Sequence, residues 1–348
     1  MDVSVIIPYF NRPASIVSYT IESVRRASSE LTVEILIIDD GSTVHAAEAL
    51  GSLIGNARVI RTVNRGLLFA RLTGLASAVG TYILFLDSDD LVSEDKLAAQ
   101  VRAMERDRLD ISYTDAAKAL LIGSLDDLKF IDEAPYPSVT SPADFCFLVQ
   151  PCPHSPMFGR SFLVDAVQTA RFPPQPQYNI VAELWFHHVC ACLPARVAKV
   201  NGPRAIGGMH DSARLTNHWE YLGLGALAVM EDFLGSLAKM RDSGRLKQLL
   251  AEVAFQSWRR LPRDFHPEFA ERLLSLASAT NNLITLNTGG PVFRFLSGIL
   301  GPHRAAGLLK ILRGHSYDSC RTISDAEWAG AFTAFRDRQV VHRVSPGI

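Results

Sequence analysis

Three carboxylates crowd into one short segment, Asp87-Ser88-Asp89-Asp90, directly after the apolar run from Tyr82 to Leu86. Like charges are unfavourable at the end of a buried strand unless a cation holds them. Carboxylate oxygens suit Mg²⁺ or Mn²⁺, and such metals usually bind through one or two carboxylates together with substrate phosphates. The segment therefore indicates a metal site for a phosphate-bearing substrate. The competing interpretation is a turn or a helix N-terminus, which Asp and Ser also favour.

Apolar strands and amphipathic helices alternate over residues 1–105, which predicts a mostly parallel sheet covered on both faces. The expected strands are 3–7, 33–38, 58–62 and 82–86, and the expected helices start near Ala14, span 67–79, and follow Ser93 as N-cap. Ligands of such sheets bind outside the carboxyl ends of the strands. Three strands end there in polar segments, which begin at Pro8, Asp39 and Asp87. Their convergence predicts one nucleotide site.

The composition narrows the class of protein. A length of 348 residues indicates about two domains, or one domain with an extension. The formal net charge of −1 gives no reason to expect nucleic acid as a partner. Five scattered cysteines do not form a disulfide framework. Without a recognisable leader or a run of 18 apolar residues, the sequence predicts a cytoplasmic protein, bacterial in style.

Four motifs carry a family resemblance: Ser4–Arg12, Glu34–Ser42, Asn64–Arg71 and Phe85–Asp90. In order and spacing they resemble family 2 nucleotide-sugar glycosyltransferases with the GT-A fold. The resemblance is strong over residues 1–105 and weaker to about residue 216. It implies an α/β, GT-A type doubly wound sheet with helices on both faces. The expected domains are a glycosyltransferase domain at 1–218, with a nucleotide half (1–105) and an acceptor half (106–218), and a helical C-terminal region at 219–348.

The resemblance also implies how the donor nucleotide binds. Pro8, Tyr9 and Arg12 would line the nucleoside pocket, and Asp39 would accept a hydrogen bond from the base, usually uracil. Arg71 stands where the family places a basic residue near the nucleotide. The alternative for Arg71 is a solvated or ion-paired helix residue.

The Asp-x-Asp signature of the family matches Asp87 and Asp89, with Ser88 between them on the nucleotide side. Asp89 is expected to contact Mn²⁺ or Mg²⁺ most directly. His210 follows a segment that resembles the family's strand and loop ending in a histidine near the metal, so it is a candidate third ligand. Asp211, Arg214 and His218 are expected to order over bound nucleotide.

Inverting transfer needs a base that deprotonates the acceptor hydroxyl, usually Asp or Glu. The family opens a helix with an acidic pair at the positions that Ile180 and Val181 occupy here. Glu183 is the nearby carboxylate and therefore the candidate base. Asp144 or Asp165 is the alternative source of the base, and an inactive enzyme is another. Glu183 and His187, spaced i, i+4, are a possible metal pair, although a structural contact is favoured.

The last third of the chain changes character. Helices are expected at 222–237, 246–258 and 269–279, as a dimerisation or acceptor-binding element. Residues 292–312 are apolar, with basic residues among them. They are either a basic amphipathic segment on a membrane surface, near a lipid-linked acceptor, or a packed hairpin broken at Gly301-Pro302. The hairpin is favoured because the glycines and the proline interrupt a long clean face.

Together these features predict a metal-dependent inverting glycosyltransferase. It would move a sugar from a nucleoside diphosphate sugar, a UDP-sugar, to a glycan or lipid-linked acceptor in bacterial surface polysaccharide synthesis. A homodimer and peripheral contact with the inner membrane face are further expectations. The alternatives are a nucleotidyltransferase, which lacks support because no glycine-rich loop follows the first strand, and a non-catalytic sugar-nucleotide binder.

Overall fold

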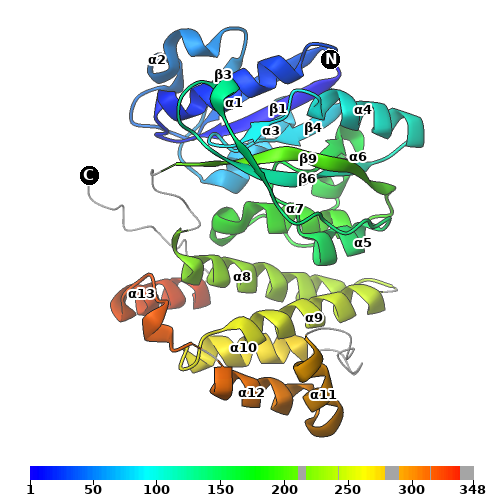
Figure 1. Ribbon diagram of the computed structural model, residues 1–348, viewed down its shortest axis with the longest axis vertical. Coiled ribbons are helices and arrows are strands. Elements are labelled where there is room, and N and C mark those ends of the chain that lie inside the picture. The colour runs from blue at the N-terminus through cyan, green and yellow to red at the C-terminus, as the bar shows by residue number, and fades with distance from the viewer. Residues whose placement is uncertain (211–216, 242, 279–289, 314, 338–348) are drawn as a thin grey trace. The chain divides into compact units, whose positions relative to one another are not determined.

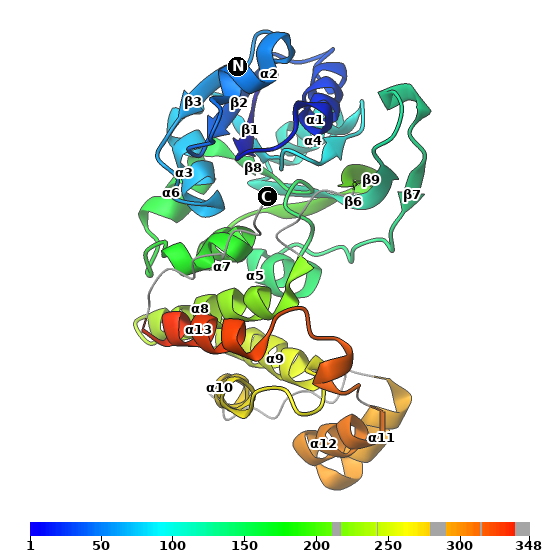
Figure 2. The same ribbon diagram turned by 90° about the vertical axis from the view of Figure 1, so that its left-hand side faces the viewer.

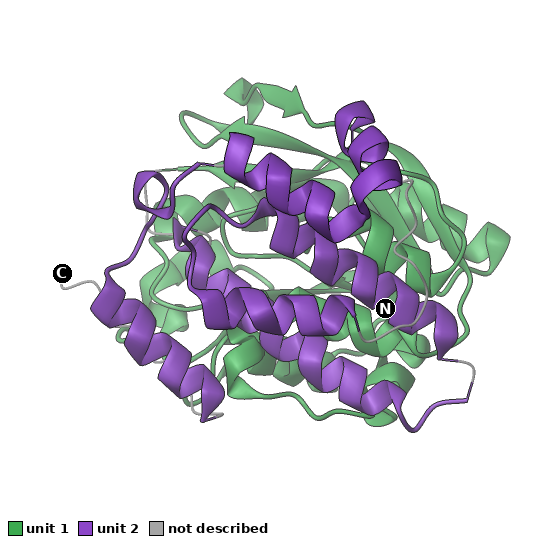
Figure 3. Ribbon diagram, turned by 90° about the horizontal axis from the view of Figure 1, so that it is seen from below, with its two compact units in different colours: residues 1–213 green, residues 214–348 purple. Residues whose placement is uncertain are grey.

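The structure is a computed structural model that describes residues 1–210, 217–241, 243–278, 290–313 and 315–337. Its chain forms two compact units, residues 1–213 and 214–348 (Figure 3). Four strands of unit 1 pair in parallel, in the order β3-β2-β1-β4: β1 (Val3–Tyr9), β2 (Val33–Asp39), β3 (Arg58–Arg61) and β4 (Tyr82–Phe85). The predicted parallel strands are confirmed, each within two residues of its expected end.

The rest of the sheet is mixed. It continues from β4 in the order β8-β6-β9-β5, and β7 pairs with β6. Strand β8 is antiparallel to both β4 and β6, whereas β6 and β9 run parallel. These strands are β5 (Leu91–Val92), β6 (Ile111–Leu120), β7 (Phe130–Asp132), β8 (Met157–Gly159) and β9 (Val197–Met209).

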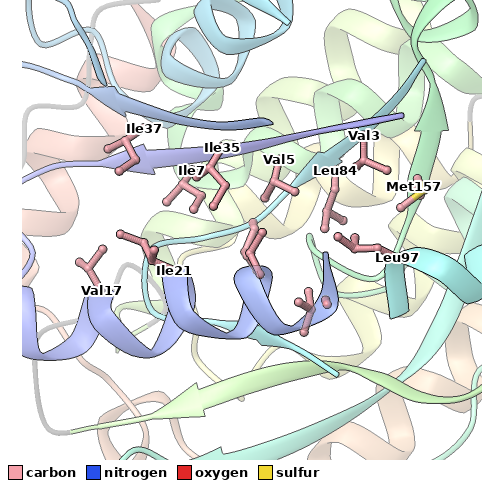
Figure 4. Close-up of a cluster of buried hydrophobic side chains, with 14 of the residues drawn as sticks. Val3, Val5, Ile7, Val17, Ile21, Ile35, Ile37, Leu84, Leu97 and Met157 are labelled. Atoms are coloured by element: carbon pink, nitrogen blue, oxygen red, sulfur yellow. The ribbon is translucent and has the colours of Figure 1, made fainter. Parts of the chain in front are cut away.

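Helices cover both faces of the parallel strands because successive side chains of a strand point to opposite faces. Helix α1 (Ala14–Ala27) packs its Val17, Ile21 and Val24 with Val5 and Ile7 of β1 in one buried cluster (Figure 4). Helix α3 (Leu67–Ser77) packs on the other face, where Gly74 approaches the side chains of Ile6 and Ile38. Burying each such Val or Ile contributes about 1.5–3 kcal/mol.

The remaining helical segments of unit 1 connect the strands (Figures 1 and 2). They are α2 (Ala46–Leu50), η1 (Gly51–Ile54), α4 (Lys96–Asp107), η2 (Leu125–Asp127), α5 (Pro142–Asp144), η3 (Phe145–Val149), α6 (Arg160–Gln168), η4 (Pro176–Val181) and α7 (Ala182–Ala191). The predicted N-cap Ser93 is wrong. Its backbone N–H still donates to Arg204 of β9, so α4 starts later, with Asp95 at the N-cap position.

Unit 2 is helical in its described residues (Figure 3). Its helices are α8 (Trp219–Leu237), α9 (Gly244–Arg260), α10 (Pro267–Ala277), α11 (Pro291–Leu300), α12 (Pro302–Arg313), η6 (Tyr317–Ser319) and α13 (Asp325–Arg336). The favoured hairpin is confirmed, since α11 ends at Leu300, Gly301 follows with φ +78°, and α12 begins at Pro302. Among the described residues, no helix is long and apolar enough to cross a bilayer.

Candidate active site

Side-chain contacts join the loops after the parallel strands. Asn11 follows β1 and adopts the left-handed conformation at φ 49°. Its N–H donates to Ser42 Oγ at 3.0 Å, and its Oδ1 accepts from the Thr43 N–H at 2.8 Å. In the same way Asp40 accepts from the N–H groups of Arg65 and Gly66, at 2.9 and 2.7 Å. The predicted convergence of these loops is therefore present.

Asp89 lies between two candidate site residues from distant segments. Arg12 Nη2 is 3.2 Å from Asp89 Oδ2, and His210 Nε2 is 2.9 Å from the same oxygen. Asp89 and His210 are largely buried, with 13% and 4% of their side chains exposed. The structure thus brings together the loop after β1, the acidic segment after β4 and the end of β9.

Arg71 joins Asp87 to Glu183. Its Nη2 donates to Asp87 Oδ1 at 2.7 Å, and its Nη1 lies 3.8 Å from Glu183 Oε2. The Arg71 side chain is only 1% exposed, and its guanidinium lies over the Phe85 ring. Arg71 is therefore a buried ion-paired residue, not a solvated one. Its Nε has no hydrogen-bond partner among the described residues.

Glu183 sits in the first turn of α7, directly after η4. Burial raises the pKa of its carboxyl above the ordinary value, although Arg71 opposes the shift, and the charge on Asp87 adds to it. A raised pKa is suited to a group that exchanges a proton near neutral pH. The alternatives Asp144 and Asp165 lie on α5 and α6, whereas Glu183 is the carboxylate that shares Arg71 with the acidic segment.

The nucleoside-side residues are more buried than the resemblance implied. Asp39 is fully buried, and its oxygens accept from the N–H groups of Ser42 and Ala46, both at 2.9 Å. Burial alone would raise its pKa, but these hydrogen bonds and Arg61 hold the pKa of Asp39 below its ordinary value. Tyr9 packs in the core at 2% exposure, and Pro8 and Ser88 are also buried. Their roles at the nucleotide stay predictions.

The donor groups near Asp89 fit a divalent metal. Among the described residues, no group of three or more His, Cys, Asp or Glu side chains is arranged to hold a metal ion. Asp89 and His210 nevertheless present a carboxylate oxygen and an imidazole nitrogen within 2.9 Å of each other. The carboxylate suits Mn²⁺ or Mg²⁺, and the imidazole suits Mn²⁺, when diphosphate oxygens and water complete the shell.

The metal pair of Glu183 and His187, the less favoured interpretation of their spacing, has no support in the structure. His187 is buried against the Phe145 ring, with 5.2 Å between ring centroids, and burial lowers its pKa to about 3. It is a core histidine. Asp211 and Arg214, expected over the nucleotide, lie outside the described residues.

Asn179 is a positioning residue that the sequence analysis missed. Its Oδ1 accepts from the Leu68 N–H at 2.9 Å, and its Nδ2 donates to the Arg65 carbonyl at 2.8 Å. One amide therefore holds η4 to the start of α3, the helix that carries Arg71. A second missed contact joins His154 Nδ1 and Asp90 Oδ2 at 3.0 Å. His154 is 1% exposed, so it supports the acidic segment from inside.

A substitution at Gly208 tests how the backbone of the acidic segment is positioned. A Cβ there would lie 2.1 Å from the backbone oxygen of Asp89, which cannot move aside alone. We expect Gly208→Ala to destabilise unit 1 by about 1–3 kcal/mol in urea titrations and to weaken nucleotide binding. Gly207→Ala is the matched control, because its Cβ would meet nothing closer than 3.8 Å. Equal stability and nucleotide affinity in the two variants would contradict this account.

Comparisons with known proteins show which proteins this chain is similar to. Residues 4–119 match the family model Glycosyl transferase family 2. An uncharacterized glycosyltransferase of Rickettsia conorii is 35% identical over 155 residues, which cover 43% of this chain and 24% of the relative. The Escherichia coli UDP-Glc:alpha-D-GlcNAc-diphosphoundecaprenol beta-1,3-glucosyltransferase WfaP is 35% identical over 115 residues, or 32% of this chain and 45% of WfaP. The chain thus spans less than half of either relative.

Residues 4–119 therefore resemble a family 2 glycosyltransferase domain. Over almost the whole chain, the fold is similar to that of S. aureus TarS. The structure of TarS 1-349 in complex with UDP-GlcNAc matches with a TM-score of 0.59 at 13% identity, covering 98% of this chain and 88% of that one. The fold expected from the sequence, a GT-A type domain with a helical C-terminal region, is confirmed.

Proposed function

We propose that the protein is a metal-dependent inverting glycosyltransferase. It moves a sugar from a UDP-sugar to a hydroxyl of a glycan or lipid-linked acceptor, in bacterial surface polysaccharide synthesis on the cytoplasmic side of the inner membrane. The names of two similar proteins support this choice. WfaP is named for UDP-Glc and a diphosphoundecaprenol acceptor, and TarS was solved with UDP-GlcNAc.

The observation that carries the proposal is the ion-pair chain from Asp87 through Arg71 to Glu183. It holds a carboxylate of the acidic segment and a carboxylate with a raised pKa on either side of one buried guanidinium. A transferase needs this combination: positive charge for the departing diphosphate, from Arg71 and from a cation that Asp87 would hold, and a proton acceptor close by.

In the proposed reaction, Glu183 takes the proton of the acceptor hydroxyl as that oxygen attacks the anomeric carbon. The bond from this carbon to the diphosphate breaks on the opposite side, so the configuration inverts and the nucleoside diphosphate leaves with the electron pair. Arg71 and Arg12 place positive charge beside the departing group. Asp89 and His210, with Asp87, would hold Mn²⁺ or Mg²⁺, which neutralises charge on a leaving diphosphate when bound.

Thermal unfolding with nucleotides tests the donor half of the proposal. We expect UDP with Mn²⁺ to raise the melting temperature by roughly 5 °C at about a hundred times its dissociation constant. GDP, dTDP and CDP are expected to raise it less, and UDP without metal to raise it little. Failure of all four nucleotides to stabilise the protein in the presence of Mn²⁺ or Mg²⁺ would sink the proposal.

One observation favours a second candidate, a non-catalytic sugar-nucleotide binder. Ile180 and Val181 stand where the family has its acidic pair, and their side chains cannot accept a proton. Release of UDP from UDP-glucose or UDP-GlcNAc, with acceptor or by slow hydrolysis, separates the two. Binding of UDP without any turnover on these donors would favour the binder.

A further inference from the structure

The outer faces of α11 and α12 carry large apolar side chains that no described residue covers. On α11, Val292, Phe295 and Ile299 recur at i, i+3 and i+7, so they lie on one face of the helix. On α12, Leu308, Ile311 and Leu312 recur at i, i+3 and i+4. Phe295, Ile299, Ile311 and Leu312 are each 65–69% exposed. These six side chains are called the hairpin surface below.

The hairpin surface is outside the core of unit 2. The opposite faces of the same helices hold buried residues, Phe293 and Ser297 on α11 and Ala306 on α12. The two helices pack beside each other (Figures 1 and 2). Both helices therefore already have an inner face, and the exposed stripes need another occupant. Large apolar side chains left exposed on two helices that pack together are suited to an interaction site.

The charged residues near the hairpin surface indicate which kind of partner binds there. No acidic residue occurs between Glu271 and Asp318, whereas Arg294 and Arg304 lie on the two helices themselves. Apolar side chains flanked by Arg and Lys are what an anionic lipid surface binds, since the rings and aliphatic groups enter the interface and the cations meet phosphates. A symmetric contact with a second copy would place these cations near one another.

Further basic side chains lie on the inner side of α12. Arg259, Arg260, Lys310 and His315 line a cavity of about 450 Å³ in unit 2, and no acidic side chain lies among its lining residues. Burial and the neighbouring Arg260 lower the pKa of Arg259, and burial lowers the pKa of Lys310. Bound anions would relieve this uncompensated charge, so the cavity is suited to lipid phosphate beside the hairpin.

We propose that the α11–α12 hairpin docks the protein on an anionic phospholipid surface, with the hairpin surface in the interface. The two helices lie along the membrane and do not cross it, since helices of 10 and 12 residues reach only about 15 and 18 Å. The inference concerns unit 2 alone and does not depend on the proposed transfer reaction. It gives a physical reason for a lipid-linked acceptor if that reaction is confirmed.

Vesicle co-sedimentation of the whole chain tests the docking. We expect binding to vesicles of phosphatidylcholine with about 30% phosphatidylglycerol, and at least about ten-fold weaker binding to pure phosphatidylcholine. The variant Phe295→Ser/Ile311→Ser is expected to lose at least about ten-fold in partitioning. Val63→Ser/Ile122→Ser is the matched control, because these side chains are equally exposed, at 75% and 67%, but belong to unit 1. It is expected to bind as the unchanged protein does.

Charge variants and the oligomeric state complete the test. Arg294→Gln/Arg304→Gln is expected to lose the preference for phosphatidylglycerol while keeping its melting temperature. Absence of binding by the unchanged protein would overturn the proposal, as would equal binding by Phe295→Ser/Ile311→Ser. A dimer in sedimentation velocity that the serine variant converts to monomer, without vesicle binding, would assign the hairpin surface to a second copy instead.

Discussion

Replacing Glu183 with glutamine is expected to lower kcat for sugar transfer by roughly 10²–10⁴-fold, the usual contribution of a general base. The amide keeps the size of the side chain but cannot take the proton of the acceptor hydroxyl. Glu183 is 3.8 Å from Arg71 and is not part of the Asp89 and His210 pair, so donor binding is expected to persist. Steady-state transfer assays and UDP titration measure the two effects separately.

The pH dependence of the transfer rate gives a second test of Glu183 as the base, because the direction of the change can be predicted. The base works only when ionised, so activity falls as pH drops through the pKa of Glu183, which burial raises above the ordinary value of about 4.3. Arg71 holds that pKa down, and an Arg71→Gln variant that still folds is expected to move the acidic limb of the rate profile to higher pH. Glu105→Gln, an exposed site on α4, is the control. Turnover that survives Glu183→Gln would remove Glu183 as the base while leaving the fold assignment intact.

The nucleotide half was predictable because its signals are local. The parallel strands β1, β2 and β4 are mainly apolar runs that end at polar residues, and parallel pairing brings these ends to one edge of the sheet. The register shows the consequence, since Tyr9 of β1 stands opposite Asp39 of β2. The order of the loops along the sheet then follows from strand order alone.

The connection between the two halves was not predictable from local pattern. Arg71 and Glu183 lie far apart in the sequence, and their contact depends on where α7 packs. That packing is fixed partly by the Asn179 amide, which bonds to backbone groups of Arg65 and Leu68. A side-chain amide that hydrogen-bonds to backbone groups produces no periodic pattern in a sequence.

Lys96 belongs to a polar pattern in the sequence from which its burial could have been predicted. It is fully buried with Gln100 on α4, and burial lowers its pKa to about 7. Its Nζ donates to Gln100 Oε1 at 2.6 Å and to the Ser155 carbonyl at 2.9 Å. The polar pair at i, i+4 faces Ser112 and Thr114, which alternate on β6. Polar residues that recur at i, i+4 on a helix and at alternate positions on the neighbouring strand indicate a buried polar network. The charge of a lysine considered alone would instead predict an exposed side chain.

Replacing Asp89 with asparagine is expected to abolish the metal dependence of nucleotide binding. The asparagine amide keeps the shape of the side chain and an oxygen near His210, but it lacks the charge that attracts a divalent cation. With Mn²⁺ present, the dissociation constant for UDP is expected to rise by at least about ten-fold, in the range that weakened metal coordination produces. Without metal, the affinities of the two proteins should agree, because Arg12 remains beside the site. Isothermal titration with and without Mn²⁺ measures both.

His210 and Asp95 make this result specific. His210→Gln is expected to weaken metal-dependent binding in the same direction, since His210 Nε2 and Asp89 Oδ2 lie 2.9 Å apart. Asp95→Asn alters a carboxylate that pairs with Arg204 near the start of α4, so it removes equal charge outside the site. If Asp89→Asn binds UDP with Mn²⁺ as tightly as the Asp95→Asn control, the metal assignment at Asp89 is wrong. The charge of Asp89 would then serve only to hold Arg12 and His210 in place, and the crowding of carboxylates at this strand end would need another cation to explain it.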